Sequence, residues 1–372
     1  MKMNIRKIFF NLFCKLSFLL IYNHCVNAQD ISSLKKAASI YQNPFDLASG
    51  GASMTRATQE GVLFANPSLP AFGEGIIRSI FFKNTVSVGA QSIGFLNDAA
   101  AAFGSFNTTQ LQNLLGDIVK KPVYFGLDSA AGIVTSSFSI AGFSSAKIDL
   151  NGRQFGILGL PNIQIKSNGF LGVASAISTQ FANTLAIGIG PKYIYNAEIN
   201  ADLGVNDILN ASQAQSIITN ALKKGTAIST DIGVTLQKRT KHFDVRLAGV
   251  VADVGNTQFT GGVPPWLQTY NAGVGLTLHD ETNALHCALD FRDISDVYKE
   301  DLPKKVYMGC KLLITRIFGL GFGYLQGWPS YGFVLNLFLM RIEAGTYTKD
   351  AGNYQAGLLG RQVYFASLGF EL

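Results

Sequence analysis

The chain ends in the stretch Val363-Tyr-Phe-Ala-Ser-Leu-Gly-Phe-Glu-Leu372, whose side chains alternate in character. One parity is almost wholly apolar or aromatic, and comprises Tyr364, Ala366, Leu368, Phe370 and Leu372. The other parity carries Ser367, Gly369 and Glu371. Side chains with a period of two are typical of a β-strand. Since only a closed sheet leaves no unpaired backbone edge in a membrane, a chain ending in such a strand predicts an outer-membrane β-barrel.

The first 28 residues have the pattern of a secretory signal peptide. Residues 1–15 carry four basic residues and no acid, residues 16–22 form a short apolar core, and Val26-Asn27-Ala28 offers small residues for cleavage. The apolar run is shorter than the ~20 residues of a membrane-spanning helix. The residues before Cys25 lack the small character of a lipidation signal. We therefore predict cleavage before Gln29, which exports the chain toward the outer membrane.

Composition excludes some function classes. The sequence has 30 basic and 24 acidic residues, and removing the four basic residues of the signal leaves 26 basic against 24 acidic, so the mature chain is close to neutral. No basic stripe interleaved with aromatic residues is present, so we expect no nucleic-acid partner. Hydrophobic residues make up 48% and charged ones 15%, yet outside the signal no run has the length of a membrane helix. Apolar surface without spanning helices again favours strands.

Short alternating segments separated by turn residues continue from about residue 170 onward. One face of each is apolar, while the other is mostly Gly, Ala, Ser and Thr, as in Phe318-Gly-Leu-Gly-Phe-Gly-Tyr324. A two-sheet sandwich also alternates, but charged residues usually dominate its solvent face. Small residues on the second face suit a lumen packed against a plug or a narrow channel. We predict an all-β fold, an antiparallel transmembrane barrel of about fourteen strands.

Two segments break the strand rhythm and predict loop helices. Residues 108–121 carry an apolar stripe with a cap at Asn107 or Thr108 and end at Pro122. Residues 206–224 repeat the pattern and end with Lys223-Lys224 before Gly225. We expect both helices to cover apolar surface at the barrel rim.

The segment before the first strand contains Gly50-Gly51-Ala52 and Asn66-Pro67-Ser68. Its glycine pair and Asn-Pro step favour tight turns in a compact, irregular segment. Together with Lys305-Val-Tyr-Met-Gly309, Leu320-Gly-Phe-Gly-Tyr-Leu-Gln-Gly327 and other downstream segments, these elements resemble the long-chain fatty acid transporter (FadL-type) superfamily of outer-membrane barrels. That superfamily includes conjugal-transfer-type barrels and the cargo-shuttling barrel of type IX secretion.

The resemblance implies a barrel at residues 76–372 with a hatch, or plug, at residues 29–75. Gly50, Gly51, Asn66, Pro67 and Ser68 are its expected hatch and ligand-site residues. We expect the barrel to pass or bind hydrophobic small molecules such as fatty acids. The alternative is a component that docks or shuttles a secreted protein partner, without transport of its own. Ser68 replaces the family's usual alanine, and Leu372 replaces the usual terminal phenylalanine, which bears on recognition by the assembly machinery.

Three observations concern chemistry. The chain has few histidines and no Gly-x-Ser-x-Gly elbow, so we expect no enzymatic activity and no cofactor; an outer-membrane lipid enzyme is a weaker third option. His279 and His286 flank a polar turn that suits solvent better than a metal. Cys287 and Cys310 fall on consecutive strands, either as a disulfide or as two free thiols facing lipid.

Charges on strands predict the inward face, because a lipid-facing charge near the midplane costs ~2 to 4 kcal/mol. Asp290 and Arg292 oppose an apolar parity, as Glu371 does in the last strand. We expect these three to face the lumen, where the first two bond the hatch or a neighbouring strand or contact an anionic ligand.

Overall fold

The computed structural model describes residues 41–56, 59–72, 77–92, 122–154, 161–204, 207, 210–280, 282–315, 317–350 and 360–372. The expected signal peptide and the expected helix at residues 108–121 lie outside these ranges. Within the described residues, no helix combines the length and hydropathy needed to span a membrane.

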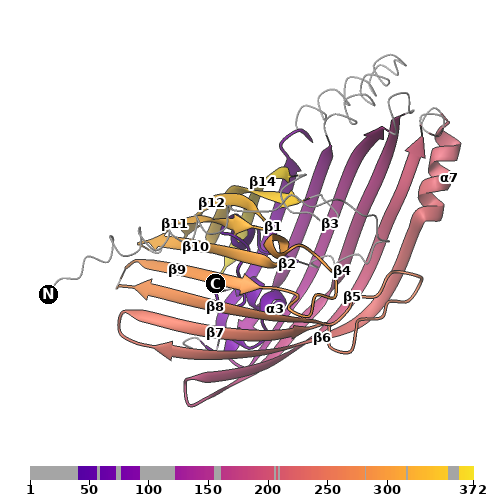
Figure 1. Ribbon diagram of the computed structural model, residues 1–372. Helices are drawn as coiled ribbons and strands as arrows, with labels where there is room; N and C mark the ends of the chain where they lie inside the picture. The colour runs from indigo at the N-terminus through magenta and orange to yellow at the C-terminus, as the bar shows by residue number, and fades with distance from the viewer. Residues whose placement is uncertain are drawn as a thin grey trace. The chain divides into compact units, whose positions relative to one another are not determined.

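Fourteen antiparallel strands form a closed barrel, as the alternation predicted (Figure 1). They are β1 (Ile77–Gly89), β2 (Val123–Thr135), β3 (Phe138–Gln154), β4 (Pro161–Phe181), β5 (Leu185–Gly204), β6 (Leu222–Arg239), β7 (Phe243–Ala252), β8 (Thr269–His279), β9 (Ala284–Phe291), β10 (Val306–Ile314), β11 (Phe318–Leu325), β12 (Trp328–Leu337), β13 (Met340–Asp350) and β14 (Gly360–Glu371). Each strand pairs with its sequence neighbours, and β1 pairs with β14 to close the ring.

The terminal strand closes the barrel because its register with β1 runs from Phe81 opposite Glu371 to Gly89 opposite Val363. Phe370 is 50% exposed on the outer surface, whereas Phe365 of the other parity is 4% exposed. The apolar and aromatic parity therefore faces outward, where lipid would lie, and the small and polar parity faces the lumen.

The two ends of the barrel differ in their connections. At the end that holds the C-terminus and the start of β1, successive strands are joined by tight turns such as Ser136-Ser137 and Phe338-Leu339. The opposite end carries the longer connections, including α7 (Ala211–Ala221) beside the long strands β5 and β6 (Figure 1). By analogy with outer-membrane barrels, which have short periplasmic turns and longer extracellular loops, we refer to the end with the tight turns as the periplasmic end.

The helix expected at residues 206–224 is present but shorter. Asn210 caps α7 through its side-chain oxygen, as capping residues do, but the helix ends at Ala221. The placement of Lys223 and Lys224 in this helix was wrong: both belong to β6, where Lys223 pairs with Glu198 of β5. Cross-strand pairing prevailed over the helical pattern because it extends an existing ladder and sets opposite charges side by side.

The segment before β1 forms short turns of helix: α2 (Pro44–Ala48), the 3-10 helix η1 (Gln59–Gly61), α3 (Val62–Ala65) and the 3-10 helix η2 (Leu69–Ala71). Asn43 begins α2 by accepting a hydrogen bond from the Asp46 N–H at 3.0 Å, and Pro44 occupies the first turn, where its missing N–H costs nothing. A further short helix, α8 (Leu302–Lys305), precedes β10. We call the described residues 41–56 and 59–72 the hatch segment.

Candidate functional site

Glycines on the inner faces of the strands contact the hatch segment. A Cβ built on Gly321 would lie 2.9 Å from Ser49 Cβ, and one on Gly332 would lie 2.9 Å from Ala48 Cβ. On the opposite side of the strand order, a Cβ on Gly233 of β6 would overlap the Asn66 side chain. The small-residue parity predicted from the sequence therefore leaves the space that the hatch segment occupies, and the expectation of a packed lumen is confirmed.

Gly50 and Gly51 adopt φ values of +88° and +71°, which only glycine reaches without strain. A side chain on Gly50 would overlap the Met308 backbone, and a Cβ on Gly51 would lie 2.6 Å from the Leu325 side chain. The Gly50 N–H also donates to Ser330 Oγ at 3.1 Å. These glycines allow the hatch chain to turn directly against β10, β11 and β12.

Asn66, Pro67 and Ser68 contact β5 and β6. Asn66 is fully buried; its Nδ2 donates to Met54 O and to Thr235 Oγ1, both at 2.9 Å. Its Oδ1 accepts from Ser68 N at 3.0 Å and from Ser68 Oγ at 2.7 Å. This asparagine joins two parts of the hatch segment to strand β6 of the barrel. Its amide therefore has a structural role that the sequence motif did not reveal.

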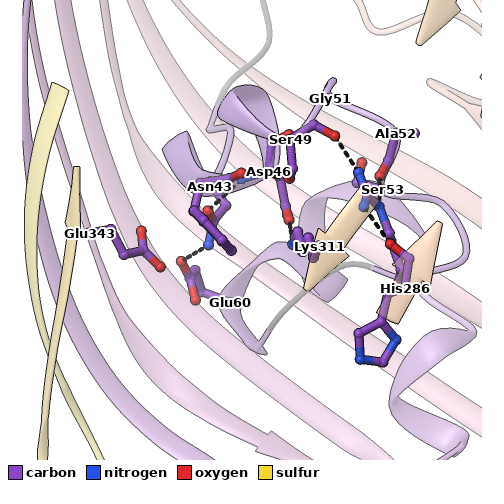
Figure 2. Close-up of polar contacts among 12 residues, drawn as sticks. Asn43, Asp46, Ser49, Gly51, Ala52, Ser53, Glu60, His286, Lys311 and Glu343 are labelled. Carbon is purple, nitrogen blue, oxygen red and sulfur yellow. Dashed lines mark hydrogen bonds and ion pairs between the residues drawn. The ribbon is translucent and has the colours of Figure 1, made fainter. Parts of the chain in front are cut away.

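A buried group of charges joins the hatch segment to β1 and β13. Figure 2 shows three residues from this region, Asn43, Glu60 and Glu343. Lys83 Nζ lies 2.9 Å from Glu60 Oε1 and 2.6 Å from Glu343 Oε2, and Arg341 Nε lies 2.6 Å from Glu343 Oε1. Asn43 Nδ2 donates to Glu60 Oε1 at 2.6 Å. Removing one partner from such a group leaves a buried charge uncompensated, which makes the group a strong attachment of the hatch segment.

A second attachment lies on β10, where the ammonium of Lys311 contacts the carboxylate of Asp46 (Figure 2). Arg56 adds hydrogen bonds within the hatch segment and to the wall: its Nε donates to Ala52 O at 2.7 Å and its Nη1 donates to His286 O at 3.2 Å. Burial lowers the pKa of Arg56 to about 10, while Asp46 and Asp290 act in the opposite direction. The guanidinium therefore remains charged at neutral pH.

Asp290 and Arg292 hold the hatch segment from β9 and its adjoining loop. Asp290 is fully buried, and its Oδ2 accepts from the backbone N–H groups of Ser53 at 2.7 Å and Met54 at 3.1 Å. Arg292 Nη2 donates to Gly51 O at 2.7 Å, and its guanidinium carbon lies 4.1 Å from the centre of the Tyr307 ring. Both charges therefore contact the hatch segment.

Several of these attachments were not predicted from the sequence. Lys83, Asp46, Glu60 and Lys311 are all nearly buried, and none of them was expected to attach the hatch segment. In the sequence, the feature that could have indicated these attachments is a single charged residue inside an otherwise apolar stretch. Glu371 lies on the inner parity at the periplasmic end of β14, opposite Phe81, and belongs to a different level of the barrel from Asp290.

A cavity of about 190 Å³ lies between the hatch segment, the strands β5 to β8, and the connections from β7 to β8 and from β9 to β10. Tyr41, Phe64 and Trp266 give it aromatic walls, and Lys192 and Asp231 add a polar side. The rings of Tyr41 and Phe64 are 5.0 Å apart, and those of Phe259 and Trp266 are 4.8 Å apart. Lys192 Nζ bonds Asp231 Oδ2 at 2.6 Å, so this polar pair is already satisfied. The rest of the lining is mixed in character and includes further polar and charged side chains, among them Asn271, Arg292 and Asp293.

Cys287 and Cys310 are directly opposite each other on β9 and β10 and form a disulfide, which resolves the alternative that the sequence left open. The two histidines do not face each other: His279 pairs in register with Ala284, and His286 bonds Thr277 Oγ1 at 2.9 Å through Nδ1. Among the described residues, no group of three or more His, Cys, Asp or Glu side chains is arranged to hold a metal ion.

Comparison with solved structures relates this architecture to known barrels. The Ralstonia pickettii toluene transporter TbuX matches with a TM-score of 0.51 at 12% identity, over 90% of this chain and 98% of that one. The Pseudomonas putida toluene transporter TodX gives 0.49 at 11% identity, over 92% and 99%. A Pseudomonas aeruginosa FadL homologue gives 0.34 at 9% identity, over 87% and 97%. No protein-family model and no curated protein matches the sequence.

This chain has the fold of a TbuX-type transporter barrel. The expected closed-barrel fold is thus confirmed, and its likeness to TbuX extends over nearly the whole of both chains. The likeness to TbuX shows the fold of this chain alone.

Proposed function

We propose that this protein resides in the outer membrane and passes or binds small hydrophobic compounds. The observation that carries the proposal is the cavity of about 190 Å³ with aromatic walls directly against the hatch segment. A cavity of roughly 150 Å³ with apolar walls accommodates benzene. By its volume this cavity suits one aromatic ring or a short acyl segment against its aromatic side, and a longer fatty acid would extend beyond it. The fold shared with a toluene transporter agrees with this substrate class.

Trp266 provides a direct test because it lines the cavity and the sequence contains only two tryptophans. The variant Trp328→Phe leaves Trp266 as the single reporter. Titration of this variant in detergent with toluene and with a long-chain fatty acid should change its fluorescence to saturation. The matched variant Trp266→Phe, which keeps Trp328, should show no saturable change. Absence of saturation with both compounds, together with unchanged uptake in a deletion strain, would refute the proposal.

Docking or shuttling of a secreted protein is the second candidate function. It is favoured by the buried ion pairs that fasten the hatch segment to β1 and β10, because a firmly held hatch suits a barrel that does not open for transport. This function predicts co-purification of one stoichiometric protein from the native membrane. A ligand-saturable Trp266 signal without such a protein would favour transport.

A further inference from the structure

The periplasmic rim of the barrel has one apolar sector. At the β12–β13 turn, Phe338 is 99% exposed and Leu339 is 43% exposed. Hydrogen bonds connect this turn to its neighbours: Glu371 N donates to Leu339 O at 2.9 Å, and Asn336 N donates to Ile317 O at 2.7 Å. Ile317 and the C-terminal Leu372 are themselves exposed. We call Ile317, Phe338 and Leu339 the apolar rim.

Phe338 is unfavourable in water for two reasons. Its φ of 50° lies in the left-handed region, where an ordinary turn places Asn or Gly. Its ring is almost completely exposed. The tips of the other turns at this end are polar instead: Ser136-Ser137, Ala182-Asn183-Thr184, Thr240-Lys241-His242, the turn that begins at Asp280, and the turn that begins at Thr315, ahead of Ile317. The apolar character is therefore specific to one sector of the rim.

That sector coincides with the shortest strands. β9 and β11 have 8 residues each, β10 has 9 and β12 has 10, whereas β3 to β6 have 17 to 21. Eight residues at ~3.3 Å each and a tilt of about 40° span roughly 20 Å, less than the ~25 Å apolar band of a membrane barrel. The apolar rim continues the outward-facing residues Ile314, Phe318 and Phe370, which are exposed directly above it.

We infer that the apolar rim is embedded in the acyl chains of the periplasmic leaflet, so that its turns complete the membrane-facing belt where the strands are short. This inference rests on the proposed membrane placement. The occupant is lipid because the rim is continuous with the lipid-facing belt and matches the deficit in strand length. In hydrocarbon, exposure of the Phe338 ring becomes favourable and offsets its backbone strain.

Tryptophan reporters in the Trp266→Phe/Trp328→Phe background test this inference. Phe338→Trp and Leu339→Trp report on the apolar rim. Asn183→Trp is the matched control, because Asn183 has a φ of 54° in a polar turn at the same end. Phe322→Trp reports on the outer belt, where Phe322 is 41% exposed. Each variant is reconstituted in phosphatidylcholine vesicles with ordinary or brominated acyl chains, and iodide is added on both sides.

Both rim reporters should lose emission in brominated lipid to the same extent as Phe322→Trp and resist iodide, whereas Asn183→Trp should respond to iodide alone. Rim reporters that behave like Asn183→Trp would overturn the inference. Rim reporters shielded from both quenchers would also overturn it, because a protein partner or a second copy would then cover the rim. Failure of Phe322→Trp to respond to brominated lipid would instead refute the membrane placement on which the proposed function depends.

Discussion

At the scale of single residues, buried charges determine how the hatch segment is held. Lys83 bridges Glu60 of the hatch segment and Glu343 of β13, and each of the three side chains is at most 4% exposed. A lysine between two buried carboxylates cannot be removed without leaving negative charge uncompensated. The contribution of Lys83 to stability therefore comes mainly from neutralising these two buried carboxylates.

The variant Lys83→Met should lower the free energy of unfolding by about 3 to 5 kcal/mol, since it leaves the buried Glu60 carboxylate without its ion-pair partner and removes one of the two cations that face Glu343. Guanidinium unfolding in detergent, followed by tryptophan fluorescence, measures the change. Lys238→Met removes an exposed lysine of β6 and serves as the control. Adding Glu60→Gln to Lys83→Met should restore most of the loss, because Glu343 keeps Arg341 as its partner, and no recovery would contradict the electrostatic explanation.

Two glycines on neighbouring strands provide a second residue-scale prediction. A Cβ on Gly233 would overlap Asn66 Oδ1 and lie 3.0 Å from Pro67 Cδ, whereas a Cβ on Gly249 would meet nothing within 4 Å. We expect Gly233→Ala to destabilise the protein by about 1 to 3 kcal/mol through overpacking. Gly249→Ala should leave the unfolding midpoint nearly unchanged. Equal midpoints for both variants would show that the hatch segment does not press on β6.

At the scale of elements, pairing between strands decides whether a local sequence pattern forms a helix or a strand. Residues 222–224 continue the helical pattern of α7, yet they begin β6 because Leu222 pairs with Ile199 and Lys223 with Glu198. The same pairing sets Cys287 opposite Cys310, which makes the disulfide a link between β9 and β10. The spacing of the two cysteines in the sequence was compatible with a disulfide but also with two free thiols.

Replacement of both cysteines by serine should lower the free energy of unfolding by roughly 3 kcal/mol, the value for closing a loop of about this length. The two cysteines are 23 residues apart in the sequence. Calorimetry of the folded barrel with and without reductant measures the effect, and the double serine variant should not respond to reductant. Mass spectrometry under non-reducing conditions that finds both thiols free would show that the bridge does not form.

At the scale of the whole molecule, the hatch segment and the wall form one packed structure. Attachments reach β1 through Glu60, β6 through Asn66, β9 through Ser53 and β10 through Asp46. Because these strands are distributed around the ring, the hatch segment is held from several sides. Its removal would expose the buried lumenal charges to water.

Deletion of residues 41–72 should therefore increase ionic conductance across planar bilayers, since a lumen lined by Lys83, Lys311 and Asp290 would fill with water. Single-channel recording compares the deletion with the full-length protein. The double variant Lys83→Met/Lys311→Met, which keeps the hatch segment but loses two attachments, should open intermittently. Unchanged conductance in both variants would contradict the role of the hatch segment as a barrier.

The sequence by itself determined the barrel, the strand number and the outward parity of the last strand. Alternation is a local property, and a membrane permits only one way to satisfy the backbone of isolated strands. It also placed Asp290 and Arg292 in the lumen, because charges avoid lipid. Only the tertiary structure decided their partners: Asp290 meets Ser53, and Lys83 meets both Glu60 and Glu343. These contacts join residues far apart in the chain, so their positions follow from closure of the ring and packing of the hatch segment, which no local pattern encodes.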